Sequence, residues 1–468
     1  MEFNSVGYLV LLTATVCLFF SSDYRRRLSV LIGASLLFYA VWSIPFTSLI
    51  LVSAFVDFFA ARRISRARSQ REKRLVLALS LAVNLGLLGY FKYANFFLEN
   101  VQALFGSQVS YLEIILPPGI SFYTFQTMSY TIDVYRGRLQ PTSSFRRFLL
   151  YVSFFPQLIA GPIERAGHLL VQFDHAGTRR FRVENLVSGV QMIVWGLFKK
   201  VVIADNVARV ADAVYGSPGD YGGWAMLAAS YAFTLQIYCD FSAYSEIARG
   251  SARIFGIDLM RNFDQPYLTR NIQDFWRRWH ISLSNWFRDY VYIPLGGSRG
   301  GRRRALRNLV LTMLASGLWH GAAWNFVLWG LLHGALLLAH ALSSKRRRER
   351  SATQRFGKLV AFSCWFGTFH AVVLGWILFR SPDLAVFWEF VSTIGSAIFG
   401  GVLPDAGALA FMAMTFAFVA CSHLERKYRV LEEIWGNSTM AAGFTIALLV
   451  GLSMWGVKDG ARFIYFQF

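Results

Sequence analysis

Charged residues are scarce in this chain of 468 residues, since Asp, Glu, Lys and Arg together make up 16% of it. A soluble globular protein carries about 25% of such residues. The hydrophobic share is 55%, and the mean hydropathy is +0.41. Phe, Trp and Tyr alone account for 16% of the chain, and aromatic residues with a polar edge favour the membrane–water interface. This composition excludes an ordinary soluble domain and predicts a polytopic membrane protein.

Acidic residues are scarcer than basic ones, with 27 Asp and Glu against 47 Lys and Arg, so the net charge is +20. In a soluble protein this balance would suggest nucleic acid. Here the basic residues cluster between apolar runs, where cytoplasmic loops collect Lys and Arg. We therefore expect no nucleic-acid partner and attribute the charge to topology and to attraction by anionic lipids of the bilayer.

Cysteine is rare and unpatterned. Cys17, Cys239, Cys364 and Cys421 lie in or beside apolar segments, and none forms a CxxC pair. Neither a disulfide framework nor a zinc site is indicated. The sequence also has no His/Glu spacing typical of a metal site, no GxSxG elbow and no P-loop or dinucleotide fingerprint. We predict no bound metal and no bound cofactor.

The order of charge and hydrophobicity at the N-terminus is the reverse of that in a secretory signal peptide. The first apolar stretch, Val6 to Phe20, has no basic residue before it, and the basic cluster Arg25 to Arg27 follows it. We expect a retained first membrane helix with the N-terminus outside.

Apolar runs of membrane-spanning length are abundant, given that a bilayer core needs about 20 apolar residues per helix. The basic segments 25–27, 61–74, 298–307 and 345–350 should all be cytoplasmic. Segment 308–341 must then cross an even number of times, as two short helices or a re-entrant pair that turns near Gly321. The pattern predicts an all-α fold with about eleven crossings, drawn from 5–22, 28–44, 46–61, 75–93, 145–160, 185–204, 224–244, 308–341, 359–379, 386–401, 404–422 and 439–456.

Three further regions, 115–137, 165–182 and 262–297, are too polar for spans and too apolar for ordinary loops. Backbone that is not a simple spanning helix is tolerated at membrane depth only where protein buries it or where it lines a cavity. These regions predict re-entrant or interfacial segments around a central tunnel.

Segment 273–290 has an aromatic stripe if it forms one helix, because Trp276, Trp279, Leu283, Trp286 and Tyr290 recur at three- and four-residue steps. The stripe favours an amphipathic helix at the membrane interface, with Trp anchors and a snorkelling arginine edge.

Within this helix, Asp274 and Arg278 would form an i,i+4 pair, and His280 and Ser284 would share a face. His280 adjoins the stripe in a chain with only eight histidines, so we favour a functional role for it.

A second histidine, His320, lies in the apolar segment 312–330. A neutral imidazole there suits a general base that takes a proton from an alcohol. We expect Gly317 and Gly321 to leave room for a substrate beside it. A core histidine bonded to a backbone carbonyl is the equally weighted alternative. His333 and His340 are seven apart on one apolar face and are expected to serve packing.

Acidic residues inside apolar segments include Asp133, Asp240 and Glu246, and arginines follow the first and last three residues later. A structural ion pair between helices is the favoured interpretation. A polar wall of a substrate tunnel is the alternative.

Seven motifs in order resemble the membrane-bound O-acyltransferase family. Within it the chain is most similar to the bacterial AlgI-type alginate O-acetylation proteins, and less so to the teichoic-acid D-alanylation proteins. The resemblance implies one integral membrane domain over residues 1–468, with a catalytic core at about 115–341. The motifs occupy 117–137, 154–165, 196–208, 235–250, 275–297, 318–334 and the terminal FIYFQF at 463–468.

The resemblance places the family's near-invariant histidine at His320, and its second position, usually His or Asn, at His280. It implies that His320 deprotonates an acceptor hydroxyl, while His280 orients the acceptor or stabilises the oxyanion. Around this pair we expect the substrate path to be lined by Trp279, Ser284, Trp319, Asp240 and Arg288.

The implied activity is transfer of an acyl group, expected to be acetyl, to a hydroxyl that serves exopolysaccharide O-acetylation. The donor would be a cytoplasmic thioester, either acetyl-CoA or a carrier-linked acyl group. The location would be the bacterial inner membrane, with AlgJ- or AlgX-like periplasmic acetyltransferases as partners and a polysaccharide as final acceptor. D-alanyl transfer to teichoic acid, a lipid or polysaccharide flippase, and a non-catalytic scaffold are the alternatives.

Overall fold

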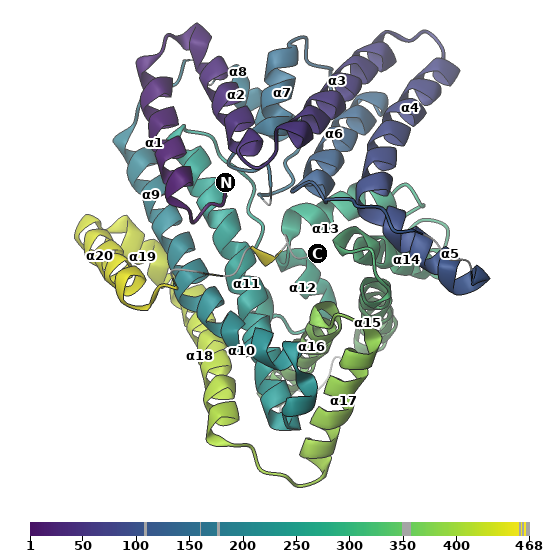
Figure 1. Ribbon diagram of the computed structural model, residues 1–468, viewed down its shortest axis with the longest axis vertical. Helices are drawn as coiled ribbons and strands as arrows, with labels where there is room; N and C mark the ends of the chain where they lie inside the picture. Colours follow the sequence, from purple (N-terminus) through teal and green to yellow (C-terminus); the bar gives the residue numbers. More distant parts are fainter. Residues whose placement is uncertain are drawn as a thin grey trace. The chain divides into compact units, whose positions relative to one another are not determined.

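The computed structural model describes residues 1–106, 110–159, 161–175, 178–348, 357–457, 460 and 463–464. Regular structure in these residues is helical, and no β-strand occurs among them (Figure 1). The all-α prediction is therefore confirmed. Seven helical segments of the described chain are long and apolar enough to cross a membrane: Ile44–Arg66, Gln70–Phe105, Val183–Gly216, Trp324–Ser343, Gly357–Arg380, Ala406–Tyr428 and Ser438–Trp455.

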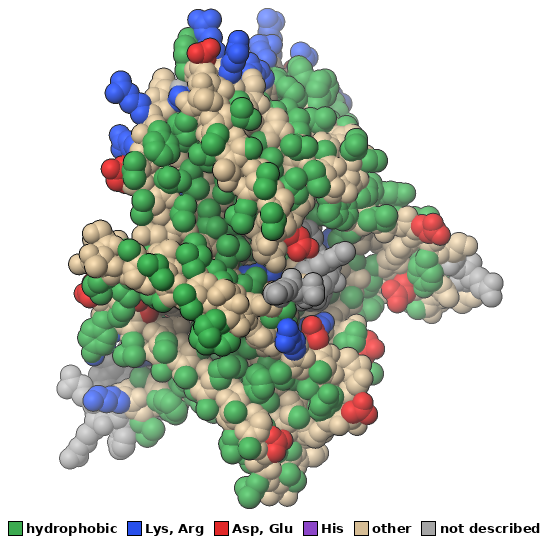
Figure 2. All heavy atoms as spheres, turned by 60° about the vertical axis from the view of Figure 1, so that its left-hand side comes forward, with side chains coloured by type: hydrophobic (Ala, Val, Ile, Leu, Met, Phe, Trp, Pro, Cys, Tyr) green, Lys and Arg blue, Asp and Glu red, His purple; other side chains and the backbone are tan. Residues whose placement is uncertain are grey.

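Two shorter apolar helices, Val6–Ser21 and Leu384–Phe399, accompany these seven spans. The total of about eleven crossings stays a prediction. Large hydrophobic side chains such as Ile44, Phe97 and Ile446 are exposed on the spans, as expected for surfaces that meet lipid. Figure 2 shows hydrophobic side chains over much of the visible face, with Lys and Arg gathered toward its upper end.

The chain forms two compact units. The first comprises Met1–Leu197 and Tyr244–Met260. In it α3 packs on α4 and α6, and α2 packs on α1 and α7. Its helices are α1 (Val6–Ser21), α2 (Tyr24–Ala40), α3 (Ile44–Arg66), α4 (Gln70–Leu88), the π-helical η1 (Gly89–Tyr93), α5 (Ala94–Phe105), α6 (Ile120–Tyr135), α7 (Phe145–Ser153), α8 (Ala166–Asp174), α9 (Val183–Leu197) and the last part of α11 (Gly223–Ile254).

The second unit comprises Phe198–Ala243 and Arg261–Phe468. In it α14 packs along α15, which also contacts α12 and α16. Besides the first part of α11, its helices are η3 (Phe198–Ala204), α10 (Asp205–Gly216), η4 (Pro218–Asp220), η5 (Pro266–Leu268), α12 (Ile272–Arg278), α13 (Ile281–Phe287), η6 (Arg288–Tyr292), α14 (Arg302–His320), α15 (Trp324–Arg348), α16 (Gly357–Arg380), α17 (Leu384–Phe399), α18 (Ala406–Tyr428), α19 (Val430–Gly436) and α20 (Ser438–Trp455).

Polar side chains start several of these helices where the sequence changes from polar to apolar. Ser43 accepts a hydrogen bond from the Phe46 N–H at the start of α3, and Ser69 does the same for Glu72 at the start of α4. Asp405 caps α18 in the same way. Such caps satisfy backbone donors that have no partner within the helix.

The predicted span 145–160 is wrong. Helix α7 contains nine residues and ends at Ser153, and turns follow it. Nine residues rise about 14 Å, roughly half of the bilayer core. Pro156 disfavours helical backbone at the residue before it, which prevents the helix from continuing.

The predicted break of segment 308–341 near Gly321 is confirmed, and the even number of crossings stays a prediction. Helix α14 ends at His320, residues 321–323 are not helical, and α15 begins at Trp324. The break therefore falls at Gly321, and His320 is only 4% exposed. Of the predicted cytoplasmic basic segment 345–350, residues 349–350 and the side chains of 345–348 lie outside the described residues.

Candidate active site

A sharp break in the backbone presents the first histidine. Residues 273–290 form two short helices, α12 and α13, rather than the predicted single helix. Between them Trp279 is extended, and His280 adopts a left-handed conformation with φ +43°. Few residues other than Gly, Asn and Asp adopt this conformation without a cost.

Asn262 supplies the hydrogen bonds that make this break possible. Its carbonyl accepts the Ile281 N–H at 2.9 Å, and its side-chain oxygen accepts the Ser282 hydroxyl at 2.6 Å. These contacts replace helical hydrogen bonds with tertiary ones. The prediction of a single helix over 273–290 is wrong. The spacing of aromatic residues in this segment does not reveal Asn262, which lies twenty residues before Ser282.

His280 is fully buried in an aromatic enclosure. Its ring lies edge-on to Phe241, with centroids 4.6 Å apart, and within 6.5 Å of Phe263. Burial lowers the pKa of His280 from 6.5 to about 3, because the charged imidazolium would lose its hydration. The imidazole is therefore neutral at physiological pH, with one nitrogen able to donate and the other able to accept.

His320 ends α14 in a similar enclosure. Its ring makes edge contacts with Trp329, at 4.9 Å between centroids, and with Phe379, at 5.3 Å. Trp329 comes from α15 and Phe379 from α16, so three helices converge on this residue.

Trp319 joins the two histidines. Its ring centroid lies 6.0 Å from that of His280 and 5.0 Å from that of His320, with both contacts edge-on. Trp319 itself is 3% exposed. The structure thus brings together the two histidines predicted from sequence, in one buried aromatic setting within the second unit.

The glycines beside His320 serve helix packing. A Cβ on Gly317 would lie 2.2 Å from the Phe326 carbonyl oxygen, and one on Gly321 would lie 2.1 Å from the Phe326 ring. Gly330 on α15 faces the Met313 carbonyl equally closely, at 2.4 Å. The expectation that Gly317 and Gly321 leave open space for a substrate is therefore wrong, because Phe326 fills that space.

His333 packs against Trp329, an aromatic side chain that also contacts His320, and the sequence did not indicate this contact. It is fully buried, with its ring centroid 4.7 Å from that of Trp329 and 5.1 Å from that of Trp276. Its Nε2 atom lies 2.7 Å from where a Cβ on Gly375 would be. The predicted packing role fits these contacts, and through Trp329 the packing extends to His320.

The other predicted lining residues differ in their surroundings. Trp279 is 1% exposed and packs against Trp376, with centroids 4.8 Å apart. The Ser284 hydroxyl donates to the Trp279 carbonyl at 3.1 Å, and its N–H donates to the His280 carbonyl at 2.9 Å in the first turn of α13.

The charged residues of this segment lie nearer the surface. Arg288 is exposed and pairs with Asp289 at 2.8 Å. The predicted pair of Asp274 with Arg278 is wrong, since Asp274 pairs with Arg277 and Arg278 reaches Asp264. Both Asp274 and Arg278 lie in α12, but the Arg278 guanidinium contacts Asp264 instead, at 3.6 Å.

Asp240 belongs to a buried ionic cluster. Lys200 Nζ lies 2.9 Å from an Asp240 carboxylate oxygen and 2.7 Å from Asp205 Oδ1. The other Asp240 oxygen accepts the Ile464 N–H at 2.7 Å. Paired charges and backbone donors are what a buried carboxylate requires. The ion-pair interpretation of Asp240 thus has direct structural support.

Lys200 was missed by sequence reasoning. It lies in the π-helical η3, and such irregular turns occur often at functional positions. A lysine pair, Lys199 and Lys200, inside an otherwise apolar run was the available signal. Lys199 is also buried, and its Nζ donates to the Ser242 hydroxyl at 2.8 Å.

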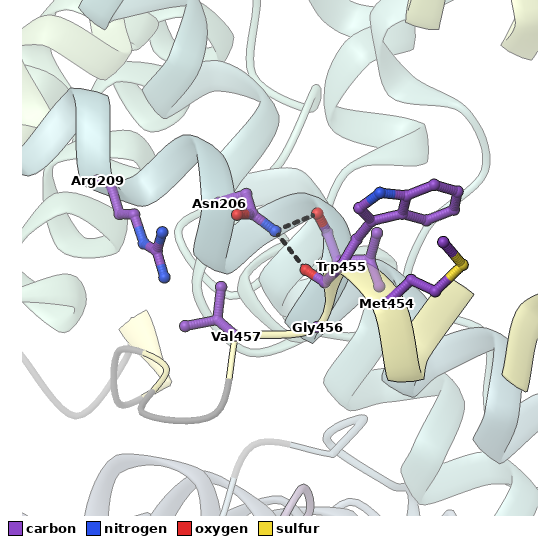
Figure 3. Close-up of a pocket in the computed structure, with 7 residues that line it drawn as sticks. Asn206, Arg209, Met454, Trp455, Gly456 and Val457 are labelled. Carbon is purple, nitrogen blue, oxygen red and sulfur yellow. Dashed lines mark hydrogen bonds between the residues drawn. The ribbon is translucent and has the colours of Figure 1, made fainter. Parts of the chain in front are cut away.

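The C-terminal segment reaches Asp240 from the end of α20. Figure 3 shows Asn206 pointing at this end, where its amide donates to the Val202 and Trp455 carbonyls. These groups border a cavity of about 540 Å³ that Arg209 also lines. The Val457 N–H donates to the Val201 carbonyl at 3.1 Å, which joins the residues after α20 to η3.

Comparison with known proteins agrees with these features. The sequence model of the membrane-bound O-acyltransferase family matches residues 134–379, a range that contains both His280 and His320. The chain is 41% identical over 434 residues to the "probable alginate O-acetylase AlgI" of Pseudomonas aeruginosa, covering 89% of this chain and 81% of that protein.

Two further relatives act on other polymers by name. The peptidoglycan O-acetyltransferase of Helicobacter pylori is 39% identical over 378 residues, covering 76% of this chain and 71% of that protein. The teichoic acid D-alanyltransferase of Bacillus subtilis is more distant, at 29% over 272 residues, covering 56% and 68%. This multi-pass membrane protein belongs to the membrane-bound O-acyltransferase family and is an O-acyltransferase.

Proposed function

We propose that this enzyme transfers an acetyl group from a cytoplasmic thioester donor to a hydroxyl acceptor, across the bacterial inner membrane, for O-acetylation of an alginate-like exopolysaccharide. The observation that carries the proposal is the buried pair His280 and His320, both in edge contact with Trp319. The identity to alginate O-acetylases over most of the chain supports the choice of acceptor.

His320 is assigned as general base. Its neutral imidazole takes the proton of the acceptor hydroxyl as the oxygen attacks the thioester carbonyl. A tetrahedral oxyanion forms, the carbon–sulfur bond then breaks, and the leaving thiolate receives the proton from the imidazolium. An ester and a thiol result, and His320 returns to its neutral form.

His280 is assigned as the donor that stabilises the oxyanion. Its lowered pKa keeps it neutral, and a neutral imidazole N–H donates a hydrogen bond without bringing a buried charge. The left-handed backbone holds this ring at a fixed place between two helices. A residue that replaces His280 must therefore tolerate the left-handed backbone conformation, whatever its side chain supplies.

The aromatic surroundings suit a thioester reaction. Trp329, Phe379, Phe241 and Phe263 contact the two imidazoles, and all four are buried. Such a setting limits water, which would otherwise hydrolyse the donor. Acetyl-CoA or a carrier-linked acetyl group would be the donor, and AlgJ- or AlgX-like periplasmic acetyltransferases would pass the group to the polysaccharide.

The base assignment is tested with His320→Asn, which keeps a buried polar side chain of similar reach. We expect acetylation of cell-surface polysaccharide to fall by about 10²–10⁴-fold, the usual contribution of a general base. His423→Asn, at an exposed histidine on α18, is the matched control and should retain activity. Persistent acetylation by a well-inserted His320→Asn protein would refute the assignment.

Two variants separate the side chain of His280 from its backbone. Asn tolerates the left-handed conformation and supplies an N–H donor, whereas Gly tolerates the conformation and supplies none. We expect His280→Asn to keep most activity and His280→Gly to lose about 10²–10³-fold in kcat, as for removal of one oxyanion donor. Equal activity of the two variants would contradict the donor role.

A reaction of purified protein with acetyl-CoA distinguishes the remaining alternatives. Thiol release that depends on His320 supports acetyl transfer. Activity only with a D-alanyl-loaded carrier would assign the enzyme to teichoic acid. Absence of thioester turnover with either donor, in protein that still supports acetylation in cells, would favour a flippase or scaffold.

A further inference from the structure

A basic pocket lies in the first unit, whereas both proposed catalytic histidines lie in the second. It has a volume of about 550 Å³ and is lined by four arginines, Arg179, Arg180, Arg182 and Arg253, together with Asn185. The walls come from the chain after α8, the start of α9 and the end of α11. Neither His280 nor His320 lines it, so the proposed acetyl transfer does not account for it.

The positive charge of this pocket exceeds its negative charge. Arg253 pairs with Asp258 at 2.7 Å, which satisfies one guanidinium. The nearby Asp174 is engaged by Arg147, also at 2.7 Å. Within the described part of the chain, Arg180 and Arg182 make no ion pair. Several guanidinium groups thus face one cavity with a single carboxylate among them, which favours an anionic ligand of more than one charge.

The pocket is held in place before any ligand arrives. Gly256 has φ +71°, and a Cβ there would lie 3.0 Å from Arg179 Nη1 and 3.3 Å from Asn185 Nδ2. Because Gly256 has no side chain, those of Arg179 and Asn185 can pack directly against its backbone. Gln172 and Asp258 exchange two hydrogen bonds of 2.8 Å between side chain and backbone, which hold in place the carboxylate partner of the lining residue Arg253. Preorganisation of this kind reduces the entropic cost of binding.

The side of the membrane is indicated by a neighbouring arginine. Arg27 Nη1 donates to the Arg179 carbonyl, so the pocket adjoins the basic turn between α1 and α2. Basic turns of this kind face the cytoplasm. The pocket is then open to cytoplasmic anions and to the headgroups of the inner leaflet.

We propose that this basic pocket binds the phosphate groups of an organophosphate ligand. Guanidinium forks match phosphate oxygens in a bidentate manner, and a cavity of this size accommodates a diphosphate or a phosphodiester with its substituents. Two sources share this chemistry: the phosphates of a thioester donor, which rests on the proposed function, and an anionic lipid headgroup, which does not.

The test uses full-length protein purified in detergent and depleted of lipid. Binding of coenzyme A is measured by calorimetry, with inorganic pyrophosphate as competitor. Binding to nanodisc lipid is measured with phosphatidylcholine alone and with phosphatidylglycerol added. The variant is Arg180→Gln/Arg182→Gln, at two exposed arginines, and the control is Arg302→Gln/Arg303→Gln, an exposed basic pair at the start of α14.

We expect the pocket variant to weaken binding about tenfold or more, because guanidinium–phosphate contacts are charge-assisted, while the control keeps the affinity of the unmodified protein. If the pocket variant loses affinity for coenzyme A, and pyrophosphate competes with coenzyme A for the unmodified protein, the phosphates bound by the pocket are those of the thioester donor. If the variant loses affinity only for nanodiscs that contain phosphatidylglycerol, the ligand of the pocket is an anionic lipid headgroup. Equal effects of the two double variants, or no effect of either, would overturn the proposal.

The same proteins distinguish failure of this proposal from failure of the proposed function. His320→Asn should bind coenzyme A or lipid unchanged while it loses acetyl transfer. If Arg180→Gln/Arg182→Gln leaves both binding and acetyl transfer unchanged, the proposal for the basic pocket fails. The proposed acetyltransferase function is then unaffected.

Discussion

The Ile464 N–H donates a 2.7 Å hydrogen bond to Asp240 Oδ2, across 224 positions of sequence. Its neighbour Phe463 lies with its ring centroid 5.7 Å from that of Phe241, which in turn contacts His280. The C-terminal segment therefore forms part of the packing behind a proposed catalytic residue. Lys200 holds the other oxygen of the same carboxylate.

Asp240→Ala should destabilise the protein by about 3–5 kcal/mol, because it leaves Lys200 with less compensation for its buried charge. Thermal unfolding and hydrogen exchange around Ile464 measure the effect. Asp212→Ala is the control, since its ion pair with Arg380 is partly exposed and should contribute at most about 1 kcal/mol. Similar losses in both variants would argue against a special role for the buried cluster.

Gly375→Ala should lower stability by about 1–3 kcal/mol, the usual effect of overpacking a buried contact. The added Cβ would lie 2.7 Å from His333 Nε2, and neither group can move without disturbing Trp329. Gly367→Ala, on the same helix, meets no atom within 4 Å and should be close to neutral.

A double variant, Gly375→Ala/His333→Ala, tests the source of this clash. If His333 is responsible, the double variant loses less stability than the sum of the single ones. Thermal unfolding in detergent gives the comparison, and strict additivity would point to another neighbour.

His280 should make the protein sensitive to acid. Its folded pKa of about 3 is below the ordinary 6.5, so the unfolded chain binds a proton that the folded one does not. The stability from this group is present above pH 6.5 and is lost as the pH falls from there toward 3. His280→Asn should flatten that part of the stability profile, measured by melting temperature against pH. An unchanged slope would contradict burial of a neutral imidazole.

His168 should act in the opposite direction. Its Nδ1 lies 2.7 Å from Glu164 Oε2, and this hydrogen bond raises the pKa of His168 above 6.5. The stability from the pair is present below pH 6.5 and is lost as the pH rises through the folded value. Between neutral and alkaline pH, the melting temperature of His168→Gln should therefore fall less than that of the unmodified protein. His423→Gln, at an exposed histidine, should keep the original profile.

The membrane class, the all-helical architecture and the choice of His280 and His320 as candidates could all be predicted from the amino-acid sequence. Hydropathy and charge are properties of the local sequence, so the break near Gly321 could be predicted from the basic segments on either side of 308–341. The motifs around His280 and His320 were continuous in sequence and therefore readable without a structure.

How these residues contact one another depends on tertiary packing, which the sequence pattern does not reveal. The left-handed turn at His280 depends on Asn262, and the space beside Gly317 and Gly321 is taken by Phe326. Lys200 and Asp205 form one cluster with Asp240 and Ile464, which lie far from them in sequence. Periodicity specifies which residues share a helical face, but it does not specify which distant group satisfies a buried charge or a freed backbone donor. Those partners are chosen by packing.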